Sequence, residues 1–227
     1  MARPADRKEN TRDRILDAAE NLFAQKGYSG TSVKGIADRA GVTGAMIHYF
    51  FRSKEALYKA VLERVASELY EMGIKVISTR KPAMERLGIY IDSFYDYAAK
   101  HPNFACMARM GVGAQDRELL RQVVTEKFRP LFKLGERFVQ QGVEDGLFKP
   151  INPSHLIATF YSVFVSSFAD AEVLNAMSGI NFESVKEKKA RKAFLSELVY
   201  RSLGVDPKLY PMKPGAGLKK TKKKANQ

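Results

Sequence analysis

The chain has few of the residues on which disulfide-bonded and membrane proteins depend. Its 227 residues include one cysteine, Cys106, which excludes an intrachain disulfide framework and suits a reducing compartment. No apolar run approaches the roughly 20 residues that a membrane-spanning helix needs. The N-terminal segment MARPADRKEN is charged and lacks the apolar stretch of a signal peptide. We therefore expect a cytoplasmic protein that has no membrane partner.

Side chains suited to catalysis or metal binding are also scarce. The histidines His48, His101 and His155 are isolated in the sequence, and the pair His101 and Cys106 is not a strong metal-ligand pattern. No glycine-rich phosphate loop follows a predicted strand. We therefore expect no enzyme activity, no metal and no cofactor.

Apolar residues at helical spacing are what the chain has in abundance. Hydrophobic residues make up 45% of it, and from Leu57 to Leu203 no stretch shows the sustained alternation typical of a sheet. The sequence predicts an all-α protein of about nine helices. After the first three, the expected helices span about 54–79, 82–100, 103–110, 115–141 (kinked or divided at Pro130), 153–177 and 182–203.

The most informative segment runs from Thr31 to Glu55 and reads as two short helices joined by a glycine turn. Thr31 or Ser32 offers a cap for the first helix, and Gly41 stands where a residue with positive φ would end it. Thr43 offers a cap for the second helix. Two helices crossed at such a turn can place the second one in the major groove of DNA. The segment therefore predicts a helix-turn-helix.

The flanking sequence makes this pattern more specific. Arg12 to Tyr28 reads R-x-x-I-L-x-A-A-x-x-L-F-x-x-x-G-Y, and the elements T-S-x-x-x-I-A-x-x-A-G-V-T and F-F-x-S-K-E-A-L follow. In order and spacing they closely resemble the tetracycline-repressor (TetR) family, over about the first quarter of the chain. The resemblance implies an N-terminal three-helix helix-turn-helix domain and a C-terminal helical domain for ligand binding and dimerisation. We place these at residues 1–54 and 55–206, followed by a basic flexible tail at 207–227.

The resemblance also implies which residues contact DNA. Those at base-contacting positions are Lys34, Gly44, Ala45 and Met46. Those at phosphate-contacting positions are Ser32, Thr43, His48, Tyr49 and Lys54. Here the chain departs from the common pattern, because Gly44-Ala45 replaces a frequent Lys-Gly pair, and His48 and Phe50 replace the usual tyrosine and histidine. We therefore expect Lys34 to read guanine, and Ala45 or Met46 to touch thymine methyl groups. A packed or capping role is the alternative for His48.

Positive charge is unevenly spread along the chain. Of the net charge of +13, residues 205–227 carry +6, in a segment with three prolines and a run of lysines. Such a composition argues against a packed element. A solvated tail and a non-specific DNA tether both fit it.

The C-terminal helices bear on the oligomeric state. An apolar stripe on the last predicted helix consists of Phe194, Leu195, Leu198, Val199 and Leu203. By periodicity alone this stripe could complete the core of a monomer. The resemblance instead implies a homodimer formed by the two C-terminal helices of each copy, with its recognition helices about one DNA turn apart.

Aromatic and methionine residues in the middle of the chain are mostly expected in the core. A minority of them would line a cavity for an apolar or amphipathic small-molecule effector. The candidates are Phe94, Met107, Met110, Phe128, Phe132, Phe160 and Phe164, with His101 and Arg109 as polar anchors.

These observations together predict a homodimeric transcriptional regulator, most often a repressor in this family. It would bind double-stranded DNA at a palindromic operator, and the effector would release it. The alternative is a DNA-bound protein of the same fold that answers to a protein partner, as in chromosome or division control. An enzyme with a DNA-binding head is disfavoured because titratable clusters are absent from the sequence.

Overall fold

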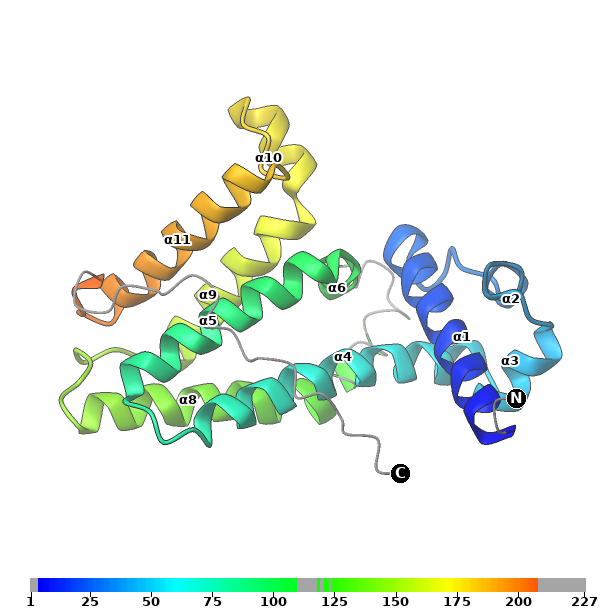
Figure 1. Cartoon of the computed structure of the whole chain (residues 1–227), viewed down its shortest axis with the longest axis horizontal. Helices are drawn as coiled ribbons and strands as arrows, with labels where there is room; N and C mark the ends of the chain where they lie inside the picture. The colour runs from blue at the N-terminus through cyan, green and yellow to red at the C-terminus, as the bar shows by residue number, and fades with distance from the viewer. Residues whose placement is uncertain (1–3, 110–117, 119–120, 123, 208–227) are drawn as a thin grey trace. The chain divides into compact units, whose positions relative to one another are not determined.

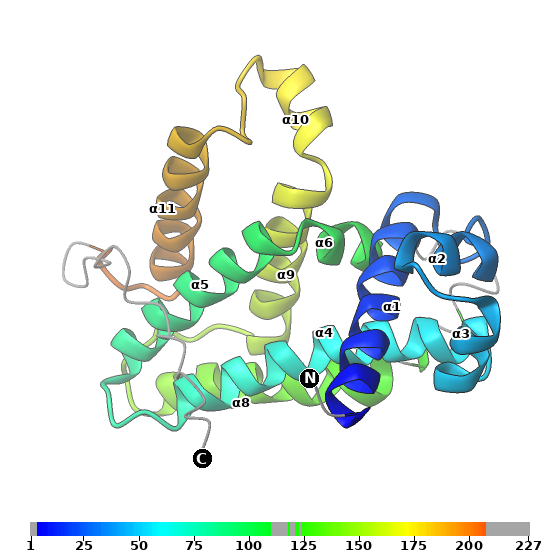
Figure 2. The same cartoon turned by 45° about the vertical axis from the view of Figure 1, so that its right-hand side comes forward.

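The computed structural model describes residues 4–109, 118, 121–122 and 124–207, and for residues 4–9, 102, 104, 108 and 109 it describes the backbone alone. Within these ranges the chain forms helices and no strand (Figures 1 and 2), which confirms the predicted all-α fold. Met110 and residues 208–227, which hold nearly all of the predicted tail, lie outside the described residues.

Ten α-helices and one π-helix are present in the described ranges. They are α1 (Pro4–Lys26), α2 (Val33–Ala40), α3 (Gly44–Phe51), α4 (Lys54–Ile77), α5 (Ala83–Lys100), α6 (Pro102–Arg109), the π-helix η1 (Val124–Phe128), α8 (Arg129–Glu144), α9 (Pro153–Ala169), α10 (Ala171–Ser178) and α11 (Val185–Ser202).

The chain divides into two compact units that interleave in sequence. The first consists of Met1–Glu68 and His101–Pro130, and the second of Leu69–Lys100 and Leu131–Gln227. The boundaries of these units differ from those of the predicted domains, because α6 packs against α1 and so belongs to the first unit.

The first unit is built around one face of α1. The apolar residues of this helix, among them Ile15 and Phe23, form a buried stripe that packs with Ile36 of α2, Ile47 of α3 and Leu57 of α4. Apolar side chains three and four residues apart form one face of a helix, so this spacing dictates which face is buried. The core therefore holds the two helices of the helix-turn-helix on a common support.

An ion-pair cluster ties α4 to α1 beside this core. Arg64 lies 2.6 Å from the carboxylate of Glu20, which is buried, and 2.7 Å from that of Asp17. Burial lowers the pKa of Arg64, but the hydrogen bonds and charges of the two carboxylates raise it further, so the net shift is upward.

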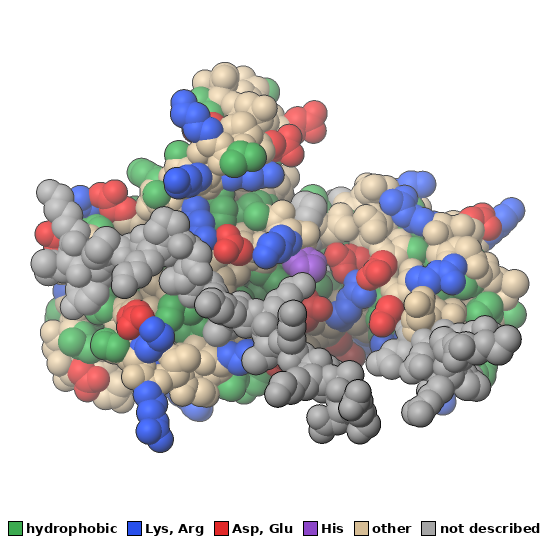
Figure 3. Space-filling view, in the orientation of Figure 1, with side chains coloured by type: hydrophobic (Ala, Val, Ile, Leu, Met, Phe, Trp, Pro, Cys, Tyr) green, Lys and Arg blue, Asp and Glu red, His purple; other side chains and the backbone are tan. Residues whose placement is uncertain are grey.

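The second unit packs α5 against α9 and α11. Leu195 and Val199 of α11 are buried beside Tyr95 of α5 and Phe164 of α9. On the outward side of α11, Phe194 is exposed, and Figure 3 shows lysine and arginine side chains together with hydrophobic ones over this region. The predicted stripe on the last helix is therefore divided between a buried and an exposed face.

One predicted helix is broken in the structure. The chain predicts a single helix over about 153–177, whereas α9 ends at Ala169 and α10 follows at an angle of 80°. Asp170 lies between them, with φ −109° and ψ 16°. Ser162 and Ser167 donate to carbonyls four residues earlier, a pattern that bends helices, and aspartate favours helix ends over interiors.

In the described residues no single helix is long and apolar enough to cross a membrane. Only α9 and α10 taken together, across their bend, satisfy the length and composition of a span.

Candidate nucleic-acid interface

Local side-chain caps define both helices of the helix-turn-helix. The hydroxyl of Ser32 accepts from Gly35 N at 3.0 Å, and that of Thr43 accepts from Met46 N at 3.3 Å. The predicted cap at Thr43 is thus confirmed, and of the two candidates for α2 it is Ser32 that caps. Thr31 is instead buried, and its hydroxyl reaches back to carbonyl groups at the end of α1.

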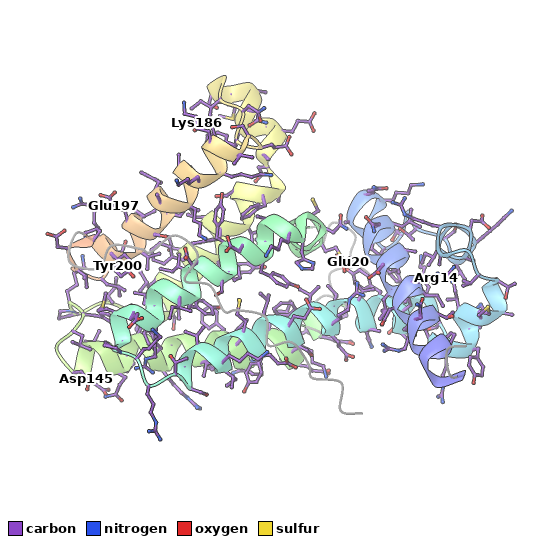
Figure 4. All side chains as sticks on the ribbon, viewed as in Figure 1. Arg14, Glu20, Asp145, Lys186, Glu197 and Tyr200 are labelled. Carbon is purple, nitrogen blue, oxygen red and sulfur yellow. The ribbon has the colours of Figure 1, made fainter. Side chains whose placement is uncertain are left out.

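The turn between α2 and α3 depends on Gly41 and on an arginine of α1. Gly41 has φ 63°, as predicted, a conformation that side chains disfavour. Arg14, labelled in Figure 4, donates to the carbonyl oxygen of Ala40 and, at 3.3 Å, to that of Gly41. A Cβ on Gly41 would lie 2.9 Å from the Arg14 guanidinium. The end of α2 is therefore held against α1, and the turn admits no larger residue without a shift.

The outward face of α3 carries apolar, imidazole and phenol side chains. Ile47 and Phe51 are buried, whereas Ala45, Met46, His48 and Tyr49 are exposed, Tyr49 by 69%. In a helix-turn-helix the exposed face of the second helix enters the major groove. Side chains on this face can therefore reach base edges without disturbing the core.

Two other predicted base-contacting positions flank this face. Lys34 is exposed in the first turn of α2. Gly44 begins α3, and a Cβ added to it would meet no atom within 4 Å. The bare Cα of Gly44 permits close approach of the backbone to another molecule.

His48 forms a hydrogen bond within the protein. Its Nδ1 lies 3.0 Å from the carbonyl oxygen of Arg52, and because that oxygen accepts, Nδ1 carries the proton of this bond. Arg52 itself has φ 65° and ψ −41°, and Ser53 N donates to Phe51 O at 2.7 Å across this tight turn.

Lys54 is half-buried in the first turn of α4 and points into the α1–α2 loop. Its ammonium donates to the carbonyl oxygens of Tyr28 at 2.9 Å and Thr31 at 3.0 Å. It also lies 4.2 Å from the centroid of the Tyr28 ring. Of the predicted phosphate-contacting residues, His48 and Lys54 are thus bonded to backbone carbonyls.

The predicted ligand-binding residues are distributed over both units. In the first unit Met107 is buried in the core with α1, Phe128 packs against that core, and His101 is half-buried before α6. The side chain of Arg109 and the whole of Met110 lie outside the described residues.

In the second unit the structure brings some of the predicted rings together. The ring of Phe94 lies 5.4 Å from that of Phe164, centroid to centroid, in an edge-to-face arrangement, and Phe160 packs against the same core. Phe132 is half-buried on α8.

A row of polar groups on α5 accompanies these rings, and the prediction did not include it. Among the described residues, Arg86 Nε and Ser93 Oγ are buried without a hydrogen-bond partner. Burial raises the pKa of Tyr90 to about 12, and its ring stacks on Phe94 at 6.2 Å. The spacing of Arg86, Tyr90 and Ser93 at i, i+4 and i+7 places them on one helical face. That spacing is the signal in the sequence that could have identified them.

Comparisons with known proteins agree with this geometry. Among relatives, the transcriptional repressor NicS of Pseudomonas putida is 26% identical over 213 residues, which are 88% of this chain and 95% of NicS. The transcriptional regulator RutR of Escherichia coli is 32% identical over 146 residues, 63% of this chain and 66% of RutR.

A solved structure shares the fold. The transcriptional regulator FadR from Bacillus subtilis, in complex with stearoyl-CoA, matches with a TM-score of 0.67 at 20% identity. The match covers 83% of this chain and 97% of that one.

Two family models cover most of the elements described above. The model of bacterial regulatory proteins of the tetR family matches residues 15–61, which include the helix-turn-helix and its supporting helix α1. The model of the tetracyclin repressor-like C-terminal domain matches residues 83–199. The interpretation of the sequence as a DNA-binding transcriptional regulator is thereby confirmed, and the chain belongs to the tetR family of bacterial regulatory proteins.

Proposed function

We propose that this regulator is a repressor, that two copies bind one palindromic operator, and that a small effector with an apolar body releases them. The observation that carries the proposed DNA binding is helix α3, which Thr43 caps and whose exposed face lies opposite the buried Ile47. We infer repression, as opposed to activation, because relatives such as NicS are repressors. Genome-wide binding of the wild-type protein tests it, because that experiment returns the operator and the neighbouring genes together.

The operator chemistry follows from the side chains available on α2 and α3. Ala45 and Met46 offer only apolar contacts, which suit the methyl group of thymine, and Lys34 offers the donor that guanine O6 and N7 accept. If Lys34 reads guanine, Lys34→Ala weakens operator binding more than binding to random DNA. Equal weakening of both would remove Lys34 from base reading.

The outward face of α11 supports a homodimer. Phe194 and Leu198 are exposed there, 58% and 36%, while Leu195 behind them is fully buried. On α9, Tyr161 is exposed, and small residues next to it permit close approach of another helix. A second copy related by two-fold symmetry would bury the same faces twice and present two recognition helices to one palindrome.

The effector region proposed here is the inner face of α5. Arg86 stacks 5.4 Å from the ring of Phe138 and donates from Nη1 to Ile77 O at 3.1 Å. A buried polar atom without a partner costs about 1–3 kcal/mol, so a ligand whose polar groups accept from Arg86 Nε and from Ser93 Oγ would be stabilised. An amphipathic molecule with an acidic or carbonyl group and an apolar chain has this chemistry. The stearoyl-CoA bound by FadR is one example.

A thermal-shift screen with fatty acids and acyl-CoA esters of increasing chain length tests this part. A ligand that binds the folded state raises the melting temperature, and the same compound must release operator DNA. Ser93→Ala and Arg86→Met should weaken both responses without loss of operator binding.

A protein partner is the second candidate for what regulates the repressor. The observation that favours it is the exposure of Val173 and Met177 on α10, 57% and 80%. If no compound both stabilises the protein and releases the operator, this candidate replaces the effector.

A further inference from the structure

Lys54 occupies a position where a positive charge is unfavourable by itself. It is the first residue of α4, whose cap Ser53 accepts from Ala56 N at 3.0 Å. The first turn of a helix carries the positive end of the helix dipole, so an ammonium there needs compensation. The carbonyl oxygens of Tyr28 and Thr31 and the face of the Tyr28 ring provide it.

These contacts use most of the bonding capacity of the side chain. An ammonium has three N–H donors, and two of those of Lys54 point to the carbonyl oxygens at 2.9 and 3.0 Å. A phosphate contact that used these donors would have to break bonds that hold the loop. Lys34, on α2, is exposed.

The loop that Lys54 holds is the segment that leads into the DNA-reading helices. Thr31 N donates to Tyr28 O at 3.3 Å, and the Thr31 hydroxyl donates to Gly27 O at 2.7 Å. The next residue, Ser32, is the cap of α2. A displacement of Lys54 would therefore also displace Tyr28 and Thr31, and with them the first turn of α2.

Aromatic packing keeps the other side of this loop in place. The Tyr28 ring lies 5.2 Å from that of Tyr58 on α4 and 6.1 Å from that of Phe23 on α1, centroid to centroid. Phe23 and Tyr58 are themselves 4.9 Å apart, edge to face. The Lys54 ammonium thus contacts both a ring of this aromatic cluster and two backbone carbonyls.

We propose that Lys54 is a positioning residue of the DNA interface and not a phosphate ligand. It ties the start of α4 to the loop of residues 27–32, and so sets the orientation of α2 and α3 on DNA. This assignment differs from the phosphate contact that the family resemblance implies for this position. It rests on the DNA-binding function alone and is independent of the effector and the dimer.

The salt dependence of DNA binding separates the two roles. Each phosphate that a protein neutralises adds about 0.9 to the slope of log affinity against log salt concentration. Lys54→Met should leave the slope for random duplex DNA unchanged. It should weaken operator binding by roughly tenfold, or about 1.4 kcal/mol, because the contacts of α2 and α3 with the operator would be misplaced. A phosphate ligand would instead lower the slope by about 0.9 per copy and weaken operator and random DNA alike.

A matched control and a second variant complete the test. Lys59→Met removes another lysine of α4, whose ammonium pairs with Glu55 at 3.1 Å, and should change neither affinity nor slope. Tyr28→Leu keeps the charge of Lys54 but removes the ring beneath it. It should weaken operator binding in the same direction as Lys54→Met, again with an unchanged slope.

A measurement on the wild-type protein, which needs only the conservative variant Lys54→Arg for assignment, covers the case in which Lys54→Met or Tyr28→Leu fails to fold. The nitrogen resonance of the Lys54 ammonium, assigned by comparison with Lys54→Arg, should not move when operator DNA is added. A reduced slope in Lys54→Met, or a shift of this resonance on DNA binding, would overturn the proposal.

Discussion

The ammonium of Lys192 on α11 lies 2.9 Å from the carboxylate of Asp92 on α5, which is 3% exposed. A second carboxylate, that of Asp96 one turn later on α5, lies at the same distance from this ammonium. Burial lowers the pKa of Lys192, but the hydrogen bonds and charges of both aspartates raise it further, so the net shift is upward. The contribution of this lysine to stability is therefore present at neutral pH and is lost as the pH rises through its elevated pKa.

Removing one partner of this pair should destabilise the second unit. Lys192→Met leaves the buried charge of Asp92 uncompensated and is expected to lower the free energy of unfolding by about 3–5 kcal/mol. Adding Asp92→Asn should recover most of that loss. Urea denaturation measures both, and Lys189→Met, at an exposed position one turn earlier on α11, is the control. A small loss in Lys192→Met would mean that solvent already screens the pair.

The two faces of α11 should respond differently to the same substitution. Leu198→Glu places a carboxylate on the exposed face and is expected to give a folded monomer that no longer binds the operator. Leu195→Glu places it in the core and should unfold the protein, because an unpaired buried charge costs several kcal/mol. Light scattering with circular dichroism distinguishes these states. A folded dimer for Leu198→Glu would exclude this face from the interface.

The turn after α3 should be sensitive to His48 through Arg52. His48→Ala removes the bond to Arg52 O and is expected to lower the free energy of unfolding by about 1 kcal/mol. Arg52→Gly should compensate in this background, because glycine adopts φ 65° without the penalty of a side chain. Thermal melts of the two single variants and the double variant test this. Additive losses would show that the turn is not strained.

Gly44 offers a site where base specificity can be changed without cost to the fold. Because an added side chain meets no atom within 4 Å, Gly44→Gln is expected to change the free energy of unfolding by less than about 0.5 kcal/mol. Glutamine bonds to adenine through N6 and N7. Selection from randomised duplexes should return a consensus with an adenine that the wild-type protein does not prefer. An unchanged consensus would place Gly44 away from the bases.

The local features of the DNA-binding region could be predicted from the sequence because their causes lie within a few residues. Ser32 and Thr43 accept hydrogen bonds from amides three positions ahead, and Gly41 ends α2 through its left-handed backbone conformation. The buried stripe of α1 follows from helical spacing in the same way. The family resemblance rests on these same short-range patterns.

The long-range partners of the charged residues were decided by tertiary structure alone. The family resemblance places Lys54 at a phosphate-contacting position, whereas its bonds to Tyr28 and Thr31 join positions more than twenty residues apart. Arg14 meets the end of α2 over a similar separation. Met107 lies in the core of the first unit because α6 packs against α1, which no periodicity within either helix could indicate.

On α11 the sequence determined an apolar stripe, and tertiary structure decided its division. Phe194 and Leu195 are equally apolar neighbours, yet one is exposed and the other fully buried. Helical periodicity describes residues relative to one another, whereas burial depends on where the neighbouring helices lie. The sequence by itself thus determined the fold class, the caps and the DNA-reading segment. The packing of α5 and α9 against α11 decided which of its apolar residues remain exposed.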